Sequence, residues 1–228
     1  MRFYHPLLEK DSESLILSKE ESIHCTKVLR MKSGMQIEII NGRGLLSYGI
    51  IEIADPKACQ IKIVNCIEKE NTKKIHIAIA PTKQMERLEW FLEKSVELGL
   101  TELSLLKCQN NERDKCRLDR LEKIAISAMK QSKRYFLPKI NPLTPLKNFL
   151  EANPEGYIAH CANSPKTNMN EIMEISTILI GPEGDFSEEE IKLANRFGYK
   201  SISLGAYRLR TETAALYGVS ALSLLTKP

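Results

Sequence analysis

The sequence lacks the features that define several large classes of protein. No apolar run approaches the ~18 residues that a membrane-spanning helix needs, and no N-terminal segment combines the basic and apolar regions of a signal peptide. We therefore expect a cytoplasmic protein with no membrane partner. The net charge of the 228 residues is only +4, so a nucleic-acid partner would have to be bound by a local basic patch.

Patterns typical of metal sites and phosphate loops are also missing. The six cysteines form no CxxC pair and no Cys/His cluster has zinc spacing, so we expect reduced thiols and no metal. Gly181 and Gly184 are not followed by Gly-Lys-Ser/Thr, which counts against an enzyme that binds phosphate through these glycines. What remains is the composition of a globular protein, 43% hydrophobic and 27% charged, with one large domain or two smaller ones.

Residues 1–70 are predicted to form a small β-rich domain. Two stretches alternate apolar and polar residues, as half-buried strands do: Met35–Asn41 and Ala58–Ile67. Asn41–Gly44 is typical of a hairpin turn, and Leu45–Ile53 is the predicted return strand. One helix interrupts the strands, with Ser18 as its N-cap and Glu21 completing a capping box. The polar segment Glu68–Lys74 is the predicted linker.

Residues 71–228 are predicted to form an α/β domain. Five short apolar runs are strand candidates: Ile75–Ala80, Leu103–Leu106, Tyr157–Cys161, Thr177–Ile180 and Ser201–Leu204. Helical periodicity covers Met85–Leu98, residues 118–132, the segment that Ser187 caps, and Thr213–Leu225. The proline-rich residues 138–154, which precede the strand candidate Tyr157–Cys161, are assigned no helix or strand. Alternating strands and helices indicate a parallel sheet with helices on both faces.

Two loops near the end of the chain are the candidate ligand site. Gly181–Asp185 follows one predicted strand, and Leu204–Arg210 follows the next. Glycines in both loops allow sharp turns and close backbone approach by a ligand. Adjacent strand–loop–helix units with glycines at the strand ends are where α/β sheets bind ligands.

The sequences GPEGDFSEEE and LGAYRLRTETAA in and after these loops resemble the family that methylates N3 of a uridine in small-subunit ribosomal RNA, within the SPOUT superfamily. Three further stretches are similar to the same family: residues 24–34, residues 80–99 and residues 128–138. The resemblance implies a SPOUT-type parallel sheet with a C-terminal trefoil knot, preceded by a PUA-like β-barrel that binds RNA. It also implies a homodimer through the C-terminal domain, with 16S rRNA of the small ribosomal subunit as the partner.

The resemblance implies S-adenosyl-L-methionine as the methyl donor. Apolar side chains at the strand ends would enclose its adenine, and the glycines would admit the backbone. The predicted cofactor-binding residues are Leu179, Ile180, Gly181, Glu183, Gly184, Leu204, Gly205 and Leu209. Two positions depart from the family pattern: Asp185 replaces the last glycine of the usual GPEGG, and Tyr207-Arg208 replaces an arginine followed by an aliphatic residue.

Arg210 and Glu212 are the predicted catalytic residues. Uracil N3 is a weak nucleophile while it is protonated, so a site must remove the proton or stabilise the oxyanions that develop at O2 and O4. Arg210, with Arg208 as a second candidate, would donate to those oxygens. Glu212, with Glu183 as a second candidate, would act as the base or hold Arg210 in place. A structural ion pair at a helix start is the alternative for Arg210 and Glu212.

Cations in both domains are candidates for RNA contact. On spacing alone, Lys27, Arg30 and Lys32 fit a solvated helix end, and the resemblance favours phosphate contact. Residues 107–134 carry nine Lys/Arg against four Asp/Glu, which fits a phosphate-facing patch or a solvated helix face equally well. The predicted RNA-binding residues are Arg2, Lys27, Arg30, Lys32, Lys83, Arg87, Arg134 and Arg208.

Two alternatives to this function stay open on the sequence. The chain could methylate another RNA, at a tRNA base or a ribose 2′-hydroxyl. It could also be a non-catalytic RNA-binding protein, with Asp185 as a sign of lost activity.

Overall fold

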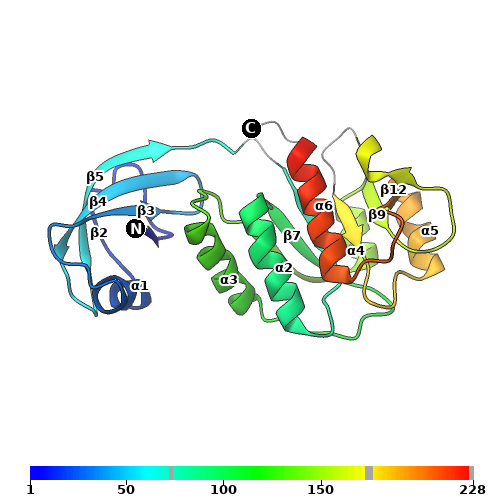
Figure 1. Cartoon of the computed structure of the whole chain (residues 1–228), viewed down its shortest axis with the longest axis horizontal. Coiled ribbons are helices and arrows are strands. Elements are labelled where there is room, and N and C mark those ends of the chain that lie inside the picture. Colours follow the sequence, from blue (N-terminus) through cyan, green and yellow to red (C-terminus); the bar gives the residue numbers. More distant parts are fainter. Residues whose placement is uncertain (72–73, 173–176, 226–228) are drawn as a thin grey trace. The chain divides into compact units, whose positions relative to one another are not determined.

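A computed structural model describes residues 1–71, 74–172 and 177–225 (Figure 1). The chain divides into two compact units. The N-terminal unit comprises residues 1–72 with 129–137, and the C-terminal unit comprises residues 73–128 with 138–228. Of the predicted linker, residues 72 and 73 lie outside the described residues. None of the helices in the described part of the chain is long and apolar enough to cross a membrane.

The N-terminal unit is built on a five-stranded mixed sheet with the order β1-β3-β4-β5-β2. The strands are β1 Arg2–Tyr4, β2 Ser14–Ile16, β3 Gln36–Ile40, β4 Leu45–Ile53 and β5 Gln60–Glu68. β1 pairs with β3 in parallel and the other pairs are antiparallel. The predicted hairpin is confirmed, with Gly42 and Gly44 at φ of 73° and 102°. Phe3, Ile39 and Ile61 are fully buried in the core that this sheet encloses.

The helical segment of this unit differs from its prediction. Ser18 Oγ accepts a hydrogen bond from the Glu21 amide at 3.2 Å, which confirms the N-cap of α1 (Lys19–Ile23). The Glu21 carboxylate does not close the capping box, because it binds Lys130 Nζ at 2.5 Å. The chain continues directly as a π-helix, η1 (His24–Val28).

Residues 129–137 complete the N-terminal unit, which nothing in the sequence pattern indicated. The Gly44 amide donates to the Tyr135 carbonyl at 3.1 Å, and the Leu137 amide donates to the Gly42 carbonyl at 2.8 Å. A Cβ at Gly44 would lie 2.7 Å from the Phe136 ring, so this close approach requires glycine.

The C-terminal unit is built on a seven-stranded sheet that is parallel throughout. Its order is β10-β12-β9-β11-β6-β7-β8. The strands are β6 His76–Ile79, β7 Glu102–Lys107, β8 Lys139–Pro145, β9 Gly156–Ala159, β10 Thr167–Asn168, β11 Ile178–Ile180 and β12 Tyr199–Ser203. The helices are α2 Met85–Leu98, α3 Leu118–Gln131, α4 Leu146–Ala152, η2 Met169–Glu171, α5 Glu188–Arg196 and α6 Thr211–Leu225. The predicted parallel sheet with flanking helices is confirmed.

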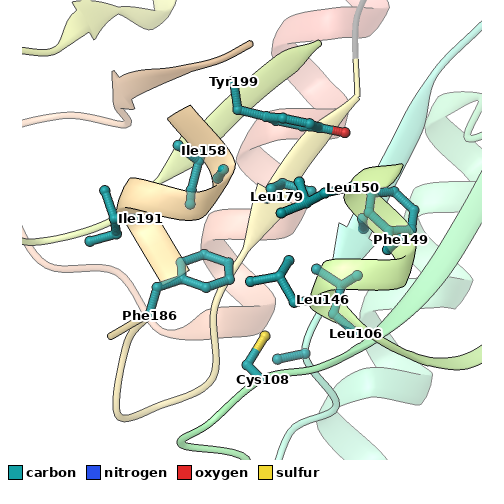
Figure 2. Packing of buried hydrophobic residues seen from close by; sticks show 13 residues of the cluster. Leu106, Cys108, Leu146, Phe149, Leu150, Ile158, Leu179, Phe186, Ile191 and Tyr199 are labelled. Atoms are coloured by element: carbon teal, nitrogen blue, oxygen red, sulfur yellow. The ribbon is translucent and has the colours of Figure 1, made fainter. Parts of the chain in front are cut away.

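Helices cover both faces of this sheet. On one face, apolar residues of α4 and α5 pack with Ile158, Leu179 and Tyr199 from the strands (Figure 2). On the other face α6 lies directly on the central strands, since a Cβ at Gly218 would meet the side chains of Ile77 and Ile178 at 3.4 Å. Successive strand residues point to opposite faces, so each short apolar strand is buried on both sides.

Two features of the domain were missed in the proline-rich stretch 138–154. It contains β8 and α4, and the sequence pattern assigned no element to it. β8 is the edge strand of the sheet, where proline is tolerated because one side of the backbone needs no ladder partner. The predicted capping of α5 by Ser187 is confirmed, and Ser187 and Glu190 exchange both hydrogen bonds of a capping box.

A buried polar network crosses the sheet at the amino ends of its central strands. His76 Nε2 lies 2.8 Å from Ser104 Oγ, and its Nδ1 lies 2.9 Å from Thr177 Oγ1. Asn141 Nδ2 donates to Ser104 Oγ at 2.9 Å and to Glu102 Oε1 at 2.7 Å. Burial lowers the pKa of His76 to about 4, with a smaller opposing effect from the Glu102 carboxylate. The imidazole is therefore neutral in the folded protein at neutral pH.

This depressed pKa makes stability depend on pH. In the unfolded chain His76 takes up a proton near its ordinary pKa of 6.5, whereas folded His76 does so only near pH 4. We expect His76 to remove about 1 kcal/mol of unfolding free energy as the pH falls from about 7.5 to about 5.5. Urea denaturation of the wild type and of His76→Gln at several pH values measures this. The variant should have the flatter profile, and equal slopes in the two proteins would contradict the assignment.

Candidate functional site

A cavity of about 540 Å³ lies at the carboxyl ends of β9, β11 and β12 and at the start of α6. β11 is paired on both sides, with β6 and with β9, although both of those strands precede it in the chain. The loops after β9 and β11 therefore leave the sheet side by side. Crevices outside the carboxyl ends of the strands, where the strand order changes direction, are the usual ligand sites of open α/β sheets.

The glycines of the two candidate loops serve different purposes. Gly205 has φ of 127°, and nothing lies within 4 Å of a Cβ built on it, so its role is conformational. A Cβ at Gly181 would lie 3.0 Å from the Phe186 ring, and one at Gly184 would lie 3.1 Å from Asn110. The prediction that Gly181 and Gly184 admit a ligand is thus incomplete, because both also make room for packing within the protein.

Six of the eight predicted cofactor-binding residues line the cavity: Ile180, Gly181, Glu183, Leu204, Gly205 and Leu209. The structure does not bring the other two to its wall. The Leu179 side chain is fully buried in the core beneath α4 and α5 (Figure 2). The Gly184 carbonyl faces Asn110, whose Nδ2 donates to it at 3.2 Å.

Arg210 and Glu212 occupy different environments. Arg210 lines the cavity, and in the described part of the chain its guanidinium has no hydrogen-bond or ion-pair partner. Glu212 is 7% exposed, does not line the cavity, and lies 3.9 Å from Arg87 Nε. The predicted Arg210–Glu212 pair is therefore wrong, since Glu212 is paired with Arg87 from α2, which also lines the cavity. Arg208 also lines it and donates to the Glu183 carbonyl at 3.1 Å.

The loop after β9 supplies cavity residues that sequence reasoning missed. His160, Cys161 and Lys166 line the cavity beside Asp185. Burial lowers the pKa of His160, the Lys166 ammonium lowers it further, and the Asp185 carboxylate opposes them. His160 and Cys161 ended the predicted strand Tyr157–Cys161 and Lys166 followed it, but no spacing links these residues to the late loops.

Three buried polar atoms in and beside the cavity have no partner among the described residues: His160 Nδ1, Glu183 Oε2 and Glu212 Oε2. Other such atoms lie away from the cavity, at His5, Glu21, Glu89 and Ser95. An unsatisfied buried polar atom costs about 1–3 kcal/mol, so native proteins keep few of them. Those of His160 and Glu183, which line the cavity, are available to a polar ligand.

Family models identify both parts of the chain. Residues 69–223 match the model described as RNA methyltransferase domain, and residues 17–64 match the RNA methyltransferase PUA domain. The first match covers more than half of the chain. The chain belongs to the RNA methyltransferase domain family. The predicted PUA-like N-terminal domain and the predicted family are confirmed by these matches.

Curated and solved relatives agree with this assignment. Ribosomal RNA small subunit methyltransferase E of Buchnera aphidicola subsp. Acyrthosiphon pisum is 30% identical over 92% of this chain and 87% of its own. A probable rRNA-methyltransferase from Porphyromonas gingivalis has a TM-score of 0.89 at 36% identity, covering 98% of this chain and 97% of its own. The Neisseria gonorrhoeae ribosomal RNA small subunit methyltransferase E, crystallised with S-adenosyl methionine, has a TM-score of 0.87 at 26% identity and covers 98% and 97%.

In the RNA methyltransferase domain, most of the predicted RNA-binding cations already have an ion-pair or hydrogen-bond partner within the protein. Lys83 Nζ pairs with Glu112 at 2.7 Å, and Arg87 pairs with Glu212. Of the basic stretch 107–134, four cations form ion pairs: Lys107, Arg117, Arg120 and Lys130. These pairs favour a solvated, charge-paired surface over a continuous phosphate-facing patch.

In the N-terminal unit, some of the predicted RNA-binding cations are buried and others are exposed. Arg2 is 9% exposed, pairs with Glu38 at 2.9 Å and lies over the Tyr135 ring, so its predicted RNA contact does not fit. Burial lowers the pKa of Arg134, which is half-buried in the same unit. Lys27, Arg30 and Lys32 are exposed, and no ion pair involves them in the part of the chain that the structure describes.

The backbone holds this exposed set in one short segment. Lys27 lies on the π-helix η1, and Arg30 lies two residues after its end with φ of 54°. A left-handed conformation is uncommon for a non-glycine residue, and such residues and π-helices are frequent at functional sites. Lys27, Arg30 and Lys32 are called the basic turn below.

Proposed function

We propose that this protein transfers a methyl group from S-adenosyl-L-methionine to N3 of a uridine in 16S rRNA of the small ribosomal subunit. The observation that carries the proposal is the cavity at the carboxyl edge of the sheet, in the domain matched as an RNA methyltransferase domain. Relatives named ribosomal RNA small subunit methyltransferase E support the ribosomal substrate. The Neisseria relative of the same fold binds the same methyl donor.

The cavity residues fit the methyl donor, which supplies a methyl group on a sulfonium cation when bound. A volume of about 540 Å³ is within the usual range of about 300–1,000 Å³ for small-ligand sites. Ile180, Leu204 and Leu209 offer apolar walls for the adenine. The unpartnered polar atoms of His160 and Glu183 offer partners for its polar groups.

Arg210 is the residue we assign to charge stabilisation. Loss of the N3 proton places negative charge on uracil O2 and O4, and a guanidinium aimed at those oxygens lowers the barrier without having to move. Arg208 is already bonded to the Glu183 carbonyl, whereas Arg210 reaches the cavity with its donors free among the described residues. The target base must leave any stack to reach this point.

Glu212 acts through Arg87 in this proposal. Its buried carboxylate lies outside the cavity wall, so it does not contact the base and the general-base role has no geometric support. At 3.9 Å from Arg87 Nε it holds a second guanidinium at the cavity. We therefore replace the predicted pairing with Arg210 by a positioning role toward Arg87. In this proposal the acceptor of the uracil N3 proton is solvent or the RNA.

The basic turn of the PUA domain is the proposed RNA-binding surface. Three cations with no acidic partner among the described residues release counterions when they meet phosphates, which produces salt-sensitive binding. Because the chain has a net charge of only +4, such a local surface must supply much of the affinity. A cytoplasmic location follows from the proposed ribosomal substrate.

We further infer a homodimer through the C-terminal unit and a threaded C-terminal segment. Trp90 on α2 and Tyr217 and Leu224 on α6 are exposed apolar side chains on two neighbouring helices, at 45%, 46% and 87%. Such a patch supports burial against a second copy. The insertion of β11 between two earlier strands supports the trefoil knot. Sedimentation of the wild type against Trp90→Glu tests the dimer, and an unchanged mass would reject this face.

Two measurements test the proposed function. Calorimetric titration with S-adenosyl-L-methionine should show saturable binding, and absence of binding at millimolar ligand would reject any methyltransferase activity. Mass spectrometry of rRNA from a deletion strain should then show loss of one N3-methyluridine. Unchanged N3-methyluridine, with a methyl group missing elsewhere in rRNA or tRNA, would point to the alternative RNA substrates.

Arg210→Ala should lower the methyl-transfer rate at least about a hundredfold, the usual loss when one oxyanion donor is removed. The unfolding midpoint should stay unchanged, because this side chain makes no hydrogen bond or ion pair within the described structure. Single-turnover methylation of rRNA measures the rate. Arg196→Ala, which removes the same side chain from the exposed end of α5, is the control and should keep full activity. Comparable rates in the two variants would refute the donor role.

Replacing Arg30 and Lys32 together by alanine should weaken RNA binding and reduce its salt dependence. Removal of one side chain that binds a phosphate should lower the slope of log K against log salt by about one. Binding measured by fluorescence anisotropy between about 50 and 200 mM salt gives this slope. Lys10→Ala is the matched control, since Lys10 already pairs with Glu68 at 3.5 Å. An unaltered slope in the double variant would place the RNA elsewhere.

A further inference from the structure

The carboxylate of Asp185, in the cavity wall, is held by backbone amides from two segments. Its Oδ2 accepts from the Cys161 amide at 2.7 Å, and its Oδ1 accepts from the Phe186 amide at 2.8 Å. Its backbone lies in the left-handed region with φ of 65°, which costs free energy for any residue other than glycine. Residues in uncommon backbone conformations are frequent at functional sites, and Asp185 lies in the wall of the cavity.

The hydrogen bonds of Asp185 tie three loops together. Besides the bond to the loop after β9, its amide donates to the Pro182 carbonyl at 2.9 Å within the loop after β11. Its own carbonyl accepts from Asn110 Nδ2, in the loop after β7, at 3.0 Å. These bonds fix the position of the carboxylate, so its charge stands at a defined place in the wall.

More cations than carboxylates line the cavity, which disfavours the binding of a cationic ligand. Four cations line the cavity, Arg87, Lys166, Arg208 and Arg210, against two carboxylates, Glu183 and Asp185. Arginines suit an RNA base that becomes anionic, but they repel a sulfonium. Charges in a partly desolvated cavity interact more strongly than in bulk water, so an opposing carboxylate would have a measurable effect.

We infer that Asp185 makes the cavity prefer the positively charged methyl donor over the neutral thioether that remains after methyl transfer. This inference rests on the proposed function and adds to it a device that favours product release. The donor, S-adenosyl-L-methionine, and the product, S-adenosylhomocysteine, share the adenosine and the amino-acid tail. They differ in one methyl group and one charge. A carboxylate that only tied the loops together would change the affinity for both by the same factor.

The experiment measures the ratio of two dissociation constants by calorimetry, that of S-adenosylhomocysteine divided by that of S-adenosyl-L-methionine. In the full-length Asp185→Asn variant this ratio should fall about threefold to tenfold, the size expected for one charge acting across a partly solvated cavity. Sinefungin, which carries an ammonium in place of the methyl sulfonium, should lose affinity together with the donor. Glu189→Gln removes the same charge from an exposed site on α5 outside the cavity wall and should leave the ratio unchanged.

Asp185→Gly provides an independent check, because glycine adopts the left-handed backbone without strain and removes the charge. It should lower the ratio as Asp185→Asn does, even if the looser loops reduce the affinity for both ligands. An unchanged ratio in both variants, with both ligands still bound, would overturn the inference and leave the proposed function standing. If the wild type bound neither ligand, the proposed function itself would fail.

Discussion

The pairing of β11 with two strands that precede it is the constraint on which the rest of the structure depends. Leu179 stands in register with Ala78 on one side and Ile158 on the other, and the Ala80 amide extends the ladder to the Ile180 carbonyl at 2.9 Å. With both edges bonded and both faces covered, β11 cannot slide or tilt. The loop that starts at Gly181 therefore leaves the sheet at a fixed point beside the loop after β9, and the cavity forms between them.

The helices on the two faces of β11 have different roles. α4 and α5 seal one face with a dense apolar core, which anchors Leu179 and Phe186 (Figure 2). α6 packs on the other face through Gly218, and its first turn carries Glu212 to the cavity edge. His160 and Glu183, which line the cavity, each keep a buried polar atom without a partner among the described residues. Such unpartnered atoms lower the stability of a fold.

The sequence predicted elements with a strong local signal and failed where long-range contacts decide. β4 and α2 were predicted at their observed boundaries, because a hairpin turn and helical periodicity are local signals. The Arg87–Glu212 pair joins residues far apart in the chain, so sequence pattern favoured the nearer Arg210 instead. The cavity residues His160 and Lys166 carried no motif. The prediction for Gly181, a sharp turn and close approach by a ligand, did not include the Phe186 ring against it, because that contact is a product of tertiary packing.

The distribution of charge explains how the proposed enzyme would bind its RNA and then release it. Of the cations outside the basic turn and the cavity, twelve form ion pairs in the part of the chain that the structure describes. This pairing reduces the attraction of the surface for phosphates, and few phosphate contacts give modest affinity that falls as salt rises. Under the proposed function, discrimination then comes from the fit of one extruded base to the cavity, where we assign Arg210 to meet it. A protein that is not strongly basic can in this way act on one nucleotide of a very large RNA without remaining bound along its length.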